Sequence, residues 1–314
     1  MILARSASDF PFDRVAAGSA VTIGAFDGIH LGHQRLLARV QEEARLRSVP
    51  SVVMSFEPTP KEFFSSERPP ARLMRFRKKF EALRDLGIDI FFCPRFDERM
   101  KGISADAFIR TLLVHTLNTR FLEVGDDFRF ASRRSGDIDM LQRVSGTLGY
   151  TVEASDSVVV GGERASSTSV RDALWTGDLD RATTMLGRPY RMSGRVVAGQ
   201  RLGRRLGYPT ANVDLRRKQS PVMGIFAVRV KGIGDAPLDG VASVGTRPTF
   251  DGSVPLLEVH IFDFDEDIYG RYIHVDVIGR IRDELKFDDA EQLIAQMDSD
   301  SKAARSILAK HREG

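Results

Sequence analysis

The stretch Val21-Thr-Ile-Gly-Ala-Phe-Asp-Gly-Ile-His-Leu-Gly-His33 decides how the N-terminal part of the chain is organised. It predicts a buried strand, a tight glycine turn and a helix that begins near Leu31. His30 and His33 stand three residues apart at the start of that helix, so their rings share one face. A helix N-terminus offers unpaired N–H groups and partial positive charge, which attract phosphate. The stretch therefore predicts a nucleotide triphosphate site.

Strand and helix patterns alternate around this stretch as far as residue 186. Strands are expected at 20–26, 52–56, 89–93, 121–125 and 151–154, helices at 31–47, 72–86, 104–117, 137–148, 167–175 and 178–186, and an irregular lead-in with a turn near Gly18 at 1–20. Such alternation implies a parallel sheet with helices on both faces. Loops that follow the strands, at 57–60 and 126–130, should therefore meet at one edge of the sheet, where such folds bind ligands.

The pattern changes after residue 186. Strand signals recur, separated by Gly, Pro and Asp turns, at 193–197, 224–231, 241–244, 256–264 and 273–281. They predict an antiparallel barrel. A final helix is expected to start at Asp288, with Glu291 completing a capping box. The predicted fold class is α/β: a Rossmann-like domain with a parallel sheet at residues 1–186, then an antiparallel β-barrel with a terminal helix at residues 187–314.

The composition limits what the chain can be. With 314 residues, 42% apolar and 28% charged, it fits a soluble globular protein of two domains. A net charge of +3 does not imply nucleic-acid binding. The single cysteine, Cys93, excludes a disulfide framework, and its apolar neighbours favour a core thiol. Neither a membrane span nor a signal sequence is evident, so we expect a cytoplasmic monomer or weak homo-oligomer with small-molecule substrates, no nucleic acid and no membrane.

A second phosphate-binding segment is expected at Ser166-Ser-Thr-Ser-Val-Arg171. It offers hydroxyl and N–H groups at another helix start, and Arg171 lies about one turn inside that helix. Alone, the segment would more often be a helix cap, and a lone His-x-x-His would more often be an ordinary polar pair. Gly24 and Gly28 allow a ligand to approach the first turn closely. Together the two segments predict the two sides of a triphosphate site.

The barrel carries its own candidate phosphate site. Gly194-Arg-Val-Val-Ala-Gly199 leads into Leu202-Gly-Arg-Arg-Leu-Gly-Tyr-Pro-Thr-Ala-Asn212. Thr210 and Asn212 present oxygen atoms two residues apart, which suits Mg²⁺ and its phosphate oxygens. The alternative is a solvated basic turn. Further on, Glu258 lies on a predicted strand, where Leu257 and Val259 on either side of it should face the opposite side of the strand.

The N-terminal motifs are specific enough to resemble a known family. Gly24-x-Phe-Asp-Gly-x-His-x-Gly-His33, Phe56-Glu-Pro58, Val124-Gly-Asp-Asp-Phe-Arg-Phe130 and Ser166-Ser-Thr-x-x-Arg-x-x-Leu174 resemble the adenylyltransferase half of prokaryotic bifunctional riboflavin kinase/FAD synthetase, within the HxGH nucleotidyltransferase superfamily. The resemblance implies that the histidines contact ATP phosphates and that the second segment clamps the nucleotide. The implied ATP contacts are Gly24, Phe26, Gly28, His30, His33, Ser166, Ser167, Thr168 and Arg171. Asp126, Asp127 and Arg129 are implied near the flavin.

The C-terminal motifs resemble riboflavin kinase. They are Gly207-x-Pro-Thr-Ala-Asn212, Gly245-Thr-Arg-Pro-Thr-Phe250, Glu258-Val-His-x-Phe-Asp-Phe264, Asp267-x-Tyr-Gly270 and Arg282-Asp-Glu-x-Lys-Phe287. The resemblance implies Mg-ATP binding at Gly199, Gly203, Gly207, Thr210 and Asn212, with Thr210 and Asn212 as metal ligands. It implies that Glu258 is the base towards the ribityl hydroxyl and that Arg282 and Phe287 approach the flavin.

The implied function is phosphorylation of riboflavin to FMN, then adenylylation of FMN to FAD, with ATP as co-substrate and Mg²⁺ as cofactor. The catalytic residues implied are His30, His33, Arg171 and Glu258. The chain departs from the family pattern at Thr59, where His is frequent, and at Ala131, where Gly is frequent. Alternatives are a riboflavin kinase with a weak or silent adenylyl half, an HxGH adenylyltransferase for another phosphate, an aminoacyl-tRNA synthetase, and a flavin-binding module without activity.

Overall fold

The computed structural model describes residues 1–65, 69–199, 203, 207–217, 219–249 and 252–312, with backbone alone at 247–249 and 252–254. Parts of the motifs above, at 202, 204–206 and 250, lie outside the described residues. The chain divides into two compact units, Met1–Ser167 and Thr168–Gly314, each considered by itself below. Helices α7 (Ser167–Thr176) and α8 (Leu179–Leu186) group with the second unit. The functional boundary expected at residue 186 stays a prediction.

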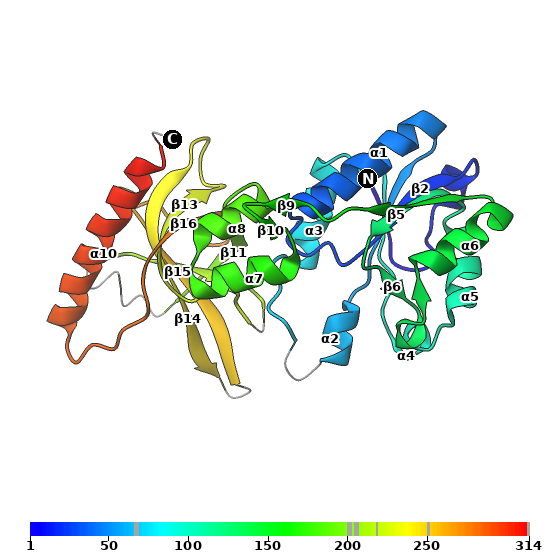
Figure 1. Ribbon diagram of the computed structural model, residues 1–314. Helices are drawn as coiled ribbons and strands as arrows, with labels where there is room; N and C mark the ends of the chain where they lie inside the picture. Colours follow the sequence, from blue (N-terminus) through cyan, green and yellow to red (C-terminus); the bar gives the residue numbers. More distant parts are fainter. Residues whose placement is uncertain (66–68, 200–202, 204–206, 218, 250–251, 313–314) are drawn as a thin grey trace. The chain divides into compact units, whose positions relative to one another are not determined.

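The first unit is built on a six-stranded parallel sheet in the order β1-β4-β3-β2-β5-β8 (Figure 1). Its strands are β1 (Ile2–Ala4), β2 (Ser19–Ile23), β3 (Ser51–Met54), β4 (Ile90–Phe92), β5 (Thr119–Gly125) and β8 (Thr151–Ser155). From β2 the chain continues to β3 and β4 on one side, then crosses back to β5 on the other. The pair β2–β5 therefore forms the topological switch point. All neighbouring pairs are parallel, so the predicted meeting of the following loops at one edge is confirmed.

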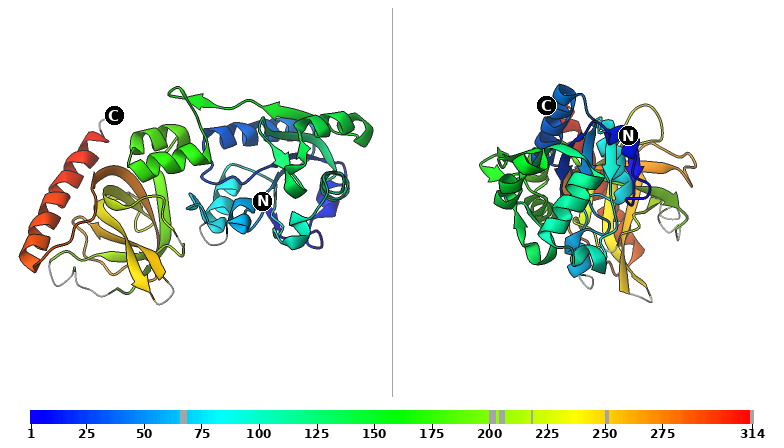
Figure 2. Two further views of the ribbon diagram at one scale, coloured as in Figure 1. Left: turned by 60° about the horizontal axis from the view of Figure 1, so that its bottom comes forward. Right: turned by 90° about the vertical axis from the view of Figure 1, so that its right-hand side faces the viewer.

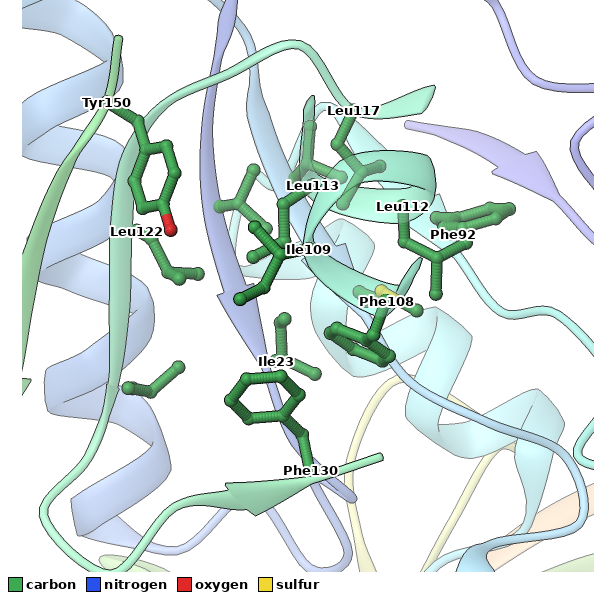
Figure 3. Packing of buried hydrophobic residues seen from close by; sticks show 14 of the residues in the cluster. Ile23, Phe92, Phe108, Ile109, Leu112, Leu113, Leu117, Leu122, Phe130 and Tyr150 are labelled. Atoms are coloured by element: carbon green, nitrogen blue, oxygen red, sulfur yellow. The ribbon is translucent and has the colours of Figure 1, made fainter. Parts of the chain in front are cut away.

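Helices cover both faces of this sheet, because its central strands are buried on both sides. They are α1 (Leu31–Arg47), α2 (Pro60–Phe64), α3 (Phe76–Asp85), α4 (Glu98–Lys101), α5 (Ala105–Ala107), which continues as a π-helical stretch (Phe108–Thr116), and α6 (Ile138–Leu148). Short strands β6 (Arg129–Phe130), β7 (Gly136–Asp137), β9 (Val159–Val160) and β10 (Glu163–Arg164) form two small hairpins. Figure 3 shows the π-helical residues packed against the strand residues Ile23, Phe92 and Leu122.

Two expectations for the first unit were wrong. Residues 1–20 are not irregular throughout, because β1 pairs with β4 at the edge of the sheet and a 3₁₀ helix spans Phe12–Val15. The helix expected from residue 72 begins only at Phe76. The preceding N–H groups of Leu73 and Met74 instead donate to the Asp27 carboxylate, at 3.0 and 2.8 Å. A polar side chain thus takes up backbone donors that a longer helix would have left unpaired.

The second unit contains the predicted antiparallel barrel, which is closed in the order β11-β12-β15-β14-β13-β16 (Figure 2). Its strands are β11 (Tyr190–Val197), β12 (Ala211–Asp214), β13 (Gly224–Lys231), β14 (Leu238–Thr249), β15 (Gly252–Ile261) and β16 (Tyr272–Arg282). Leu257 and Val259 on β15 are fully buried, whereas Glu258 between them faces the other side. The sequence did not predict β12, because four residues are too few to show a period.

Helix α10 (Ala290–Lys310) packs on the outside of the barrel through Ala304 and Leu308 (Figures 1 and 2). Its N-cap is Asp289, whose carboxylate accepts a hydrogen bond from the N–H of Gln292 at 2.8 Å. The cap expected at Asp288 was therefore wrong by one residue. Within the described chain, no helix combines the length and the apolar character needed to cross a membrane.

Ala131 has a backbone conformation that L-residues rarely adopt, with φ 65° and ψ −176°. This region is populated almost only by glycine and costs other residues about 1–3 kcal/mol. Its neighbour Ser132 is held by a hydrogen bond from its N–H to the carbonyl of Ile103, at 2.8 Å. The departure from glycine noted in the sequence therefore places strain in the loop after β6.

We expect Ala131→Gly to stabilise the first unit by about 1 kcal/mol, because relief of the strain exceeds the added flexibility of the unfolded chain. Denaturant unfolding followed by circular dichroism measures the change. The control is Ala16→Gly, at φ −57° and ψ −35°, which relieves no strain. Equal destabilisation by both substitutions would contradict the assignment of strain to Ala131.

Glu123, on β5, is a buried carboxylic acid that is 4% exposed. Its Oε2 atom has no hydrogen-bond partner among the described residues, and neither has the hydroxyl of Thr22, its neighbour across β2. Burial raises the pKa of Glu123 from 4.5 to about 7. The folded state therefore keeps a proton that the unfolded chain releases between these two pH values.

Because the folded state binds more protons in that window, its free energy of unfolding falls as pH rises from about 4.5 to about 7. We expect Glu123→Gln to remove this dependence and to stabilise the protein at pH 8, by roughly 3 kcal/mol at most. Little change is expected at pH 4. Urea unfolding at both pH values tests the prediction, with the exposed Glu42→Gln as control. A gain of equal size at both pH values would be inconsistent with a raised pKa.

Candidate functional site

The turn between β2 and α1 is held by side chains that bind its carbonyl groups. Ala25 O accepts from Lys79 Nζ at 2.5 Å, Asp27 O from Ser167 Oγ at 2.8 Å, and Ile29 O from Gln34 Nε2 at 3.0 Å. These contacts maintain an unusual backbone, in which Phe26, Gly28 and Ile29 have φ values of 48°, 89° and 45°. A positive φ is unfavourable for Phe and for β-branched Ile, so the turn depends on its surroundings.

His30 and His33 form a stacked pair at the start of α1. Their ring centroids lie 3.7 Å apart with 27° between the planes. His30 is the N-cap, and its Nδ1 accepts a weak hydrogen bond from the N–H of His33 at 3.4 Å. An accepting Nδ1 leaves the proton of a neutral ring on Nε2, where it can be donated. The structure thus brings both predicted histidines together at the switch point of the sheet.

The ring of His33 is set up to bind a ligand as a neutral imidazole. Burial, with the Coulombic effects of His30 and Lys79, holds the pKa of His33 well below its ordinary value. Its Nδ1 atom is buried and has no hydrogen-bond partner among the described residues. A buried polar atom normally has a partner, so this nitrogen is the clearest sign of a ligand position in the first unit.

The glycines of the turn serve packing as well as access. A side chain at Gly24 would meet the ring of Phe26, and one at Gly32 would meet His30 and the carbonyl of Ala165. The side chain of Phe26 is fully buried and lies 5.0 Å, centroid to centroid, from the ring of His33. Phe26 therefore supports the histidine through its ring, and only its backbone is available to a nucleotide.

The Ser166 segment begins α7, as predicted. Ser167 is the first residue of this helix and ties it to the turn through Asp27 O. Arg171 follows one helical turn later and is half-buried. Ser166 and Thr168 flank the helix start. The helix expected from Ser167 is therefore confirmed, and phosphate binding by this segment stays a prediction.

The loop after β5 is exposed and carries the predicted acidic residues. Asp126 accepts from Arg164 Nη2 at 3.0 Å and from Ser157 Oγ at 2.8 Å. Asp127 also pairs with Arg164, at 3.3 Å. Arg129 is exposed and donates to the carbonyl of Phe128. Arg164 was missed by the sequence analysis, because the hairpin β9–β10 that presents it is too short to show a pattern.

Four aromatic rings, also missed in the sequence, gather beyond the carboxyl ends of β3 and β4. They are Phe56, Phe63, Phe64 and Phe96, which meet edge to face at centroid distances of 5.2 to 5.8 Å. Phe64 is 63% exposed. Thr59 lies in the same loop and caps α2, where it forms a capping box with Glu62. The departure at Thr59 thus has a structural role in holding this aromatic cluster.

In the barrel, Asn212 and Glu258 are direct neighbours across β12 and β15, and Glu258 also pairs in register with Ser243 on β14. Residues opposite each other in an antiparallel pair project to the same face. The predicted metal ligand and the predicted base therefore lie side by side. This register could not be read from the sequence, because β12 itself was not predicted.

Gly199 and Gly203 lie close to Asn212 and Thr210. A side chain at Gly199 would collide with the amide group of Asn212, and one at Gly203 would collide with Tyr208 O and lie 3.3 Å from Thr210 Oγ1. Gly207 has φ 84°, in the region that favours glycine. Glycine thus leaves room for the neighbouring groups at 199 and 203 and permits the positive φ at 207.

A pocket of about 300 Å³ opens beside Thr210. Its walls include Val259 and Ile261 of β15 and the loop 264–269, with Asp265, Glu266 and Asp267 among the lining residues. Val259 and Ile261 face opposite to Glu258 on their strand. The pocket therefore lies on the side of β15 that faces away from Glu258, and Thr210 is among its lining residues.

The side chain of Arg282 is paired with a carboxylate on helix α10. Its guanidinium donates to both carboxylate oxygens of Asp300, at 2.9 and 2.5 Å, and Asp300 is buried. Gln296 donates to the same carboxylate at 2.9 Å. The ring of Phe287 lies 5.9 Å from the Arg282 guanidinium carbon. Arg282 and Phe287 are thus together, and the arginine is engaged by Asp300.

Neither unit presents a preformed metal cage in the described residues, because no group of three or more His, Cys, Asp or Glu side chains converges there. The oxygen donors predicted for a metal here are the hydroxyl of Thr210 and the amide oxygen of Asn212, and Asn212 is the one that lies beside Glu258. Hard oxygen donors of this kind suit Mg²⁺, which usually keeps waters and shares its coordination with substrate phosphates.

Comparison with known proteins agrees with this division into two sites. The family model for FAD synthetase matches residues 13–169, and that for riboflavin kinase matches residues 186–308. The curated bifunctional riboflavin kinase/FMN adenylyltransferase of Escherichia coli K12 is 48% identical over 291 residues, which is 93% of each chain. Its counterparts from Pseudomonas fluorescens and Haemophilus influenzae are 45% and 42% identical, and each alignment covers at least 93% of both chains.

Among solved structures, a crystal structure titled as a macrolide-efflux protein from Streptococcus pneumoniae is similar, with a TM-score of 0.80 and 30% identity. The match covers 97% of this chain and 98% of that one. The matched motifs, both family models and the near full-length identity to curated relatives lead to one conclusion. The chain belongs to the family of bifunctional riboflavin kinase/FMN adenylyltransferases.

Proposed function

We propose that the two activities of this family are carried by two separate sets of residues. The stacked His30–His33 pair and the Ser166 segment serve FMN adenylylation, and the Asn212–Glu258 pair serves riboflavin phosphorylation. The observation that carries the kinase assignment is the register that places Glu258 directly opposite Asn212. For adenylylation it is the buried Nδ1 of His33 at the switch point of the sheet, which has no hydrogen-bond partner among the residues that the structure describes.

For the kinase step, Glu258 accepts the proton of the riboflavin 5′-hydroxyl as the hydroxyl oxygen bonds to the γ-phosphorus of ATP. The bond from that phosphorus to the bridging β,γ oxygen breaks, and ADP leaves. Thr210 and Asn212 would hold Mg²⁺, which when bound neutralises phosphate charge. The residues Gly199, Gly203 and Gly207 let the backbone approach the phosphates.

The pocket beside Thr210 fits the adenine base better than the phosphates. Its floor is apolar and its rim carries Asp265, Glu266 and Asp267, whose negative charges would repel a triphosphate. With the base in this pocket, the phosphates extend past Thr210 towards Asn212. Arg282 and Phe287 are assigned together to the flavin-binding side. The Arg282 guanidinium is already held by Asp300, so it is not assigned to the flavin by itself.

For the adenylyl step, an FMN phosphate oxygen bonds to the α-phosphorus of ATP and pyrophosphate leaves. FMN phosphate is already anionic, so no strong base is needed. Neutral His33, the Nε2 proton of His30 and the N–H groups at the start of α1 stabilise the charge that develops on the phosphates. Arg171 and the hydroxyls of the Ser166 segment are assigned to the same nucleotide, on the resemblance of their motif.

The flavin ring of FMN is assigned to the aromatic cluster of Phe56, Phe63, Phe64 and Phe96. This cluster lies at the sheet edge where β2 and β5 also end, and an exposed ring such as Phe64 offers a face for stacking. Asp126, Asp127 and Arg129 in the neighbouring loop can contact the polar edge of the flavin.

We expect Glu258→Gln to lower FMN formation from riboflavin by at least about 100-fold, because the amide cannot accept the proton. FAD formation from supplied FMN should remain. Both are measured by separating flavins after incubation with ATP and Mg²⁺. The control is Glu291→Gln, at an exposed position on α10. Simultaneous loss of both activities would argue against two separate sites.

We expect His33→Ala combined with Arg171→Ala to block FAD formation and to leave FMN formation unchanged. The reason is that both side chains act on the ATP phosphates of the adenylyl step alone. Arg45→Ala, at an exposed position near the end of α1, is the control. FAD accumulation at the parent rate would refute the assignment. In the parent protein, FMN alone would indicate a silent adenylyl half, and unchanged riboflavin a binding module.

A further inference from the structure

Lys79, on α3, is a charged residue that is almost completely buried, with 3% of it exposed. Lysine is rarely found so deeply buried, because its ammonium group loses hydration. Burial lowers the pKa of Lys79, while Asp27, Cys93 and Glu57 act to raise it and Arg72 to lower it. Among the described residues, none of these groups forms an ion pair with Lys79. The hydrogen bond from its ammonium group to the Ala25 carbonyl is therefore the contact that compensates for its burial.

That contact is the carbonyl of Ala25, to which Lys79 Nζ donates at 2.5 Å. Ser55 Oγ also lies near this oxygen, at 3.5 Å, which is at the limit of a hydrogen bond. Ala25 lies in the turn between β2 and α1, and α3 comes from a distant part of the chain. Lys79 therefore fastens the turn to α3.

The fastened carbonyl directly precedes Phe26, whose φ of 48° is unfavourable for an L-residue. A carbonyl held from outside fixes the peptide plane that Phe26 must follow. The Phe26 ring then lies against the ring of His33 at 5.0 Å, and His33 stacks on His30 at 3.7 Å. A chain of contacts thus runs from Lys79 through Ala25 and Phe26 to the histidine pair.

Lys79 also acts on His33 through its charge. Its ammonium is one of three causes that lower the pKa of His33, after burial and His30. The same cation is buried, so its effect on His33, close to the helix start where phosphate charge is expected, is weakly screened by solvent. Lys79 therefore affects the His33 imidazole in two ways, through the chain of contacts and through its positive charge.

We propose that Lys79 is a positioning residue for FMN adenylylation, which sets the position of the His33 ring through the Ala25 carbonyl and Phe26. It touches none of the reacting atoms. The inference rests on the proposed role of His33. Nothing in the sequence pointed to Lys79, because a lysine within Arg75-Phe-Arg-Lys-Lys79 reads as part of a solvated basic face.

The test substitutes Lys79→Met, which keeps the apolar stem and removes the donor and the charge. We expect kcat for FAD formation from FMN to fall about 100-fold, as for a small misplacement of a catalytic group. KM for ATP should change less than threefold, and riboflavin phosphorylation in the same chain should be unchanged. The pKa of His33, followed by NMR of ¹³C-labelled histidine, should rise. A purely structural lysine would not produce this rise.

Lys78→Met is the matched control, since Lys78 pairs with Glu81 on the same helix. Lys79→Gln keeps an N–H donor without the charge, and should recover about tenfold of the lost kcat. If Lys79→Met does not fold, the glutamine variant decides the matter. A kcat within twofold of the parent, or an unchanged His33 pKa, would overturn the proposal. Should His33→Ala itself retain full activity, the proposed function fails instead, whatever Lys79 does.

Discussion

Parallel pairing of β2 with β5 is the constraint on which the first unit depends. The two strands are adjacent in space although about a hundred residues separate them, because β3 and β4 lie on the far side of β2. Their carboxyl ends therefore lie at the same edge of the sheet, at the topological switch point. The histidine turn leaves β2 at that edge, and the acidic loop leaves β5. The histidine pair and the acidic residues assigned in this unit owe their places to this crossing.

In the barrel, the residues of the candidate site are brought together by the register of antiparallel strands. Antiparallel strands bring residues from distant parts of the chain face to face, one pair at a time. Asn212 and Glu258 meet in this way across β12 and β15. The glycines around them remove side chains that would collide with the Asn212 amide and with Tyr208. A site of this kind tolerates little shift, since a slip of one residue would turn Glu258 into the barrel.

Much of the architecture was predictable from the sequence, because long periodic segments carry a clear signal. Helix α1 was expected at its observed limits, and the change from alternating elements to repeated strands marked the barrel. Short elements were not predictable: β1 and β12 have three and four residues, too few for a period. Residue types and spacing predicted a phosphate site at His30, and the resemblance of its motif to riboflavin kinase singled out Glu258. They did not reveal Lys79 or the Phe64 cluster, whose roles come from contacts between distant segments.

The pairing of Arg282 with Asp300 has a consequence for the order in which the chain becomes functional. A protein is made from its N-terminus, and domains tend to fold as they emerge. The six-stranded sheet of the first unit has all its strands once residue 155 has been added, long before the barrel exists. Arg282 ends the last barrel strand, yet its carboxylate partner is on α10, so it stays unpaired until that helix leaves the ribosome. During synthesis, the half that consumes FMN is therefore complete before the half that makes it.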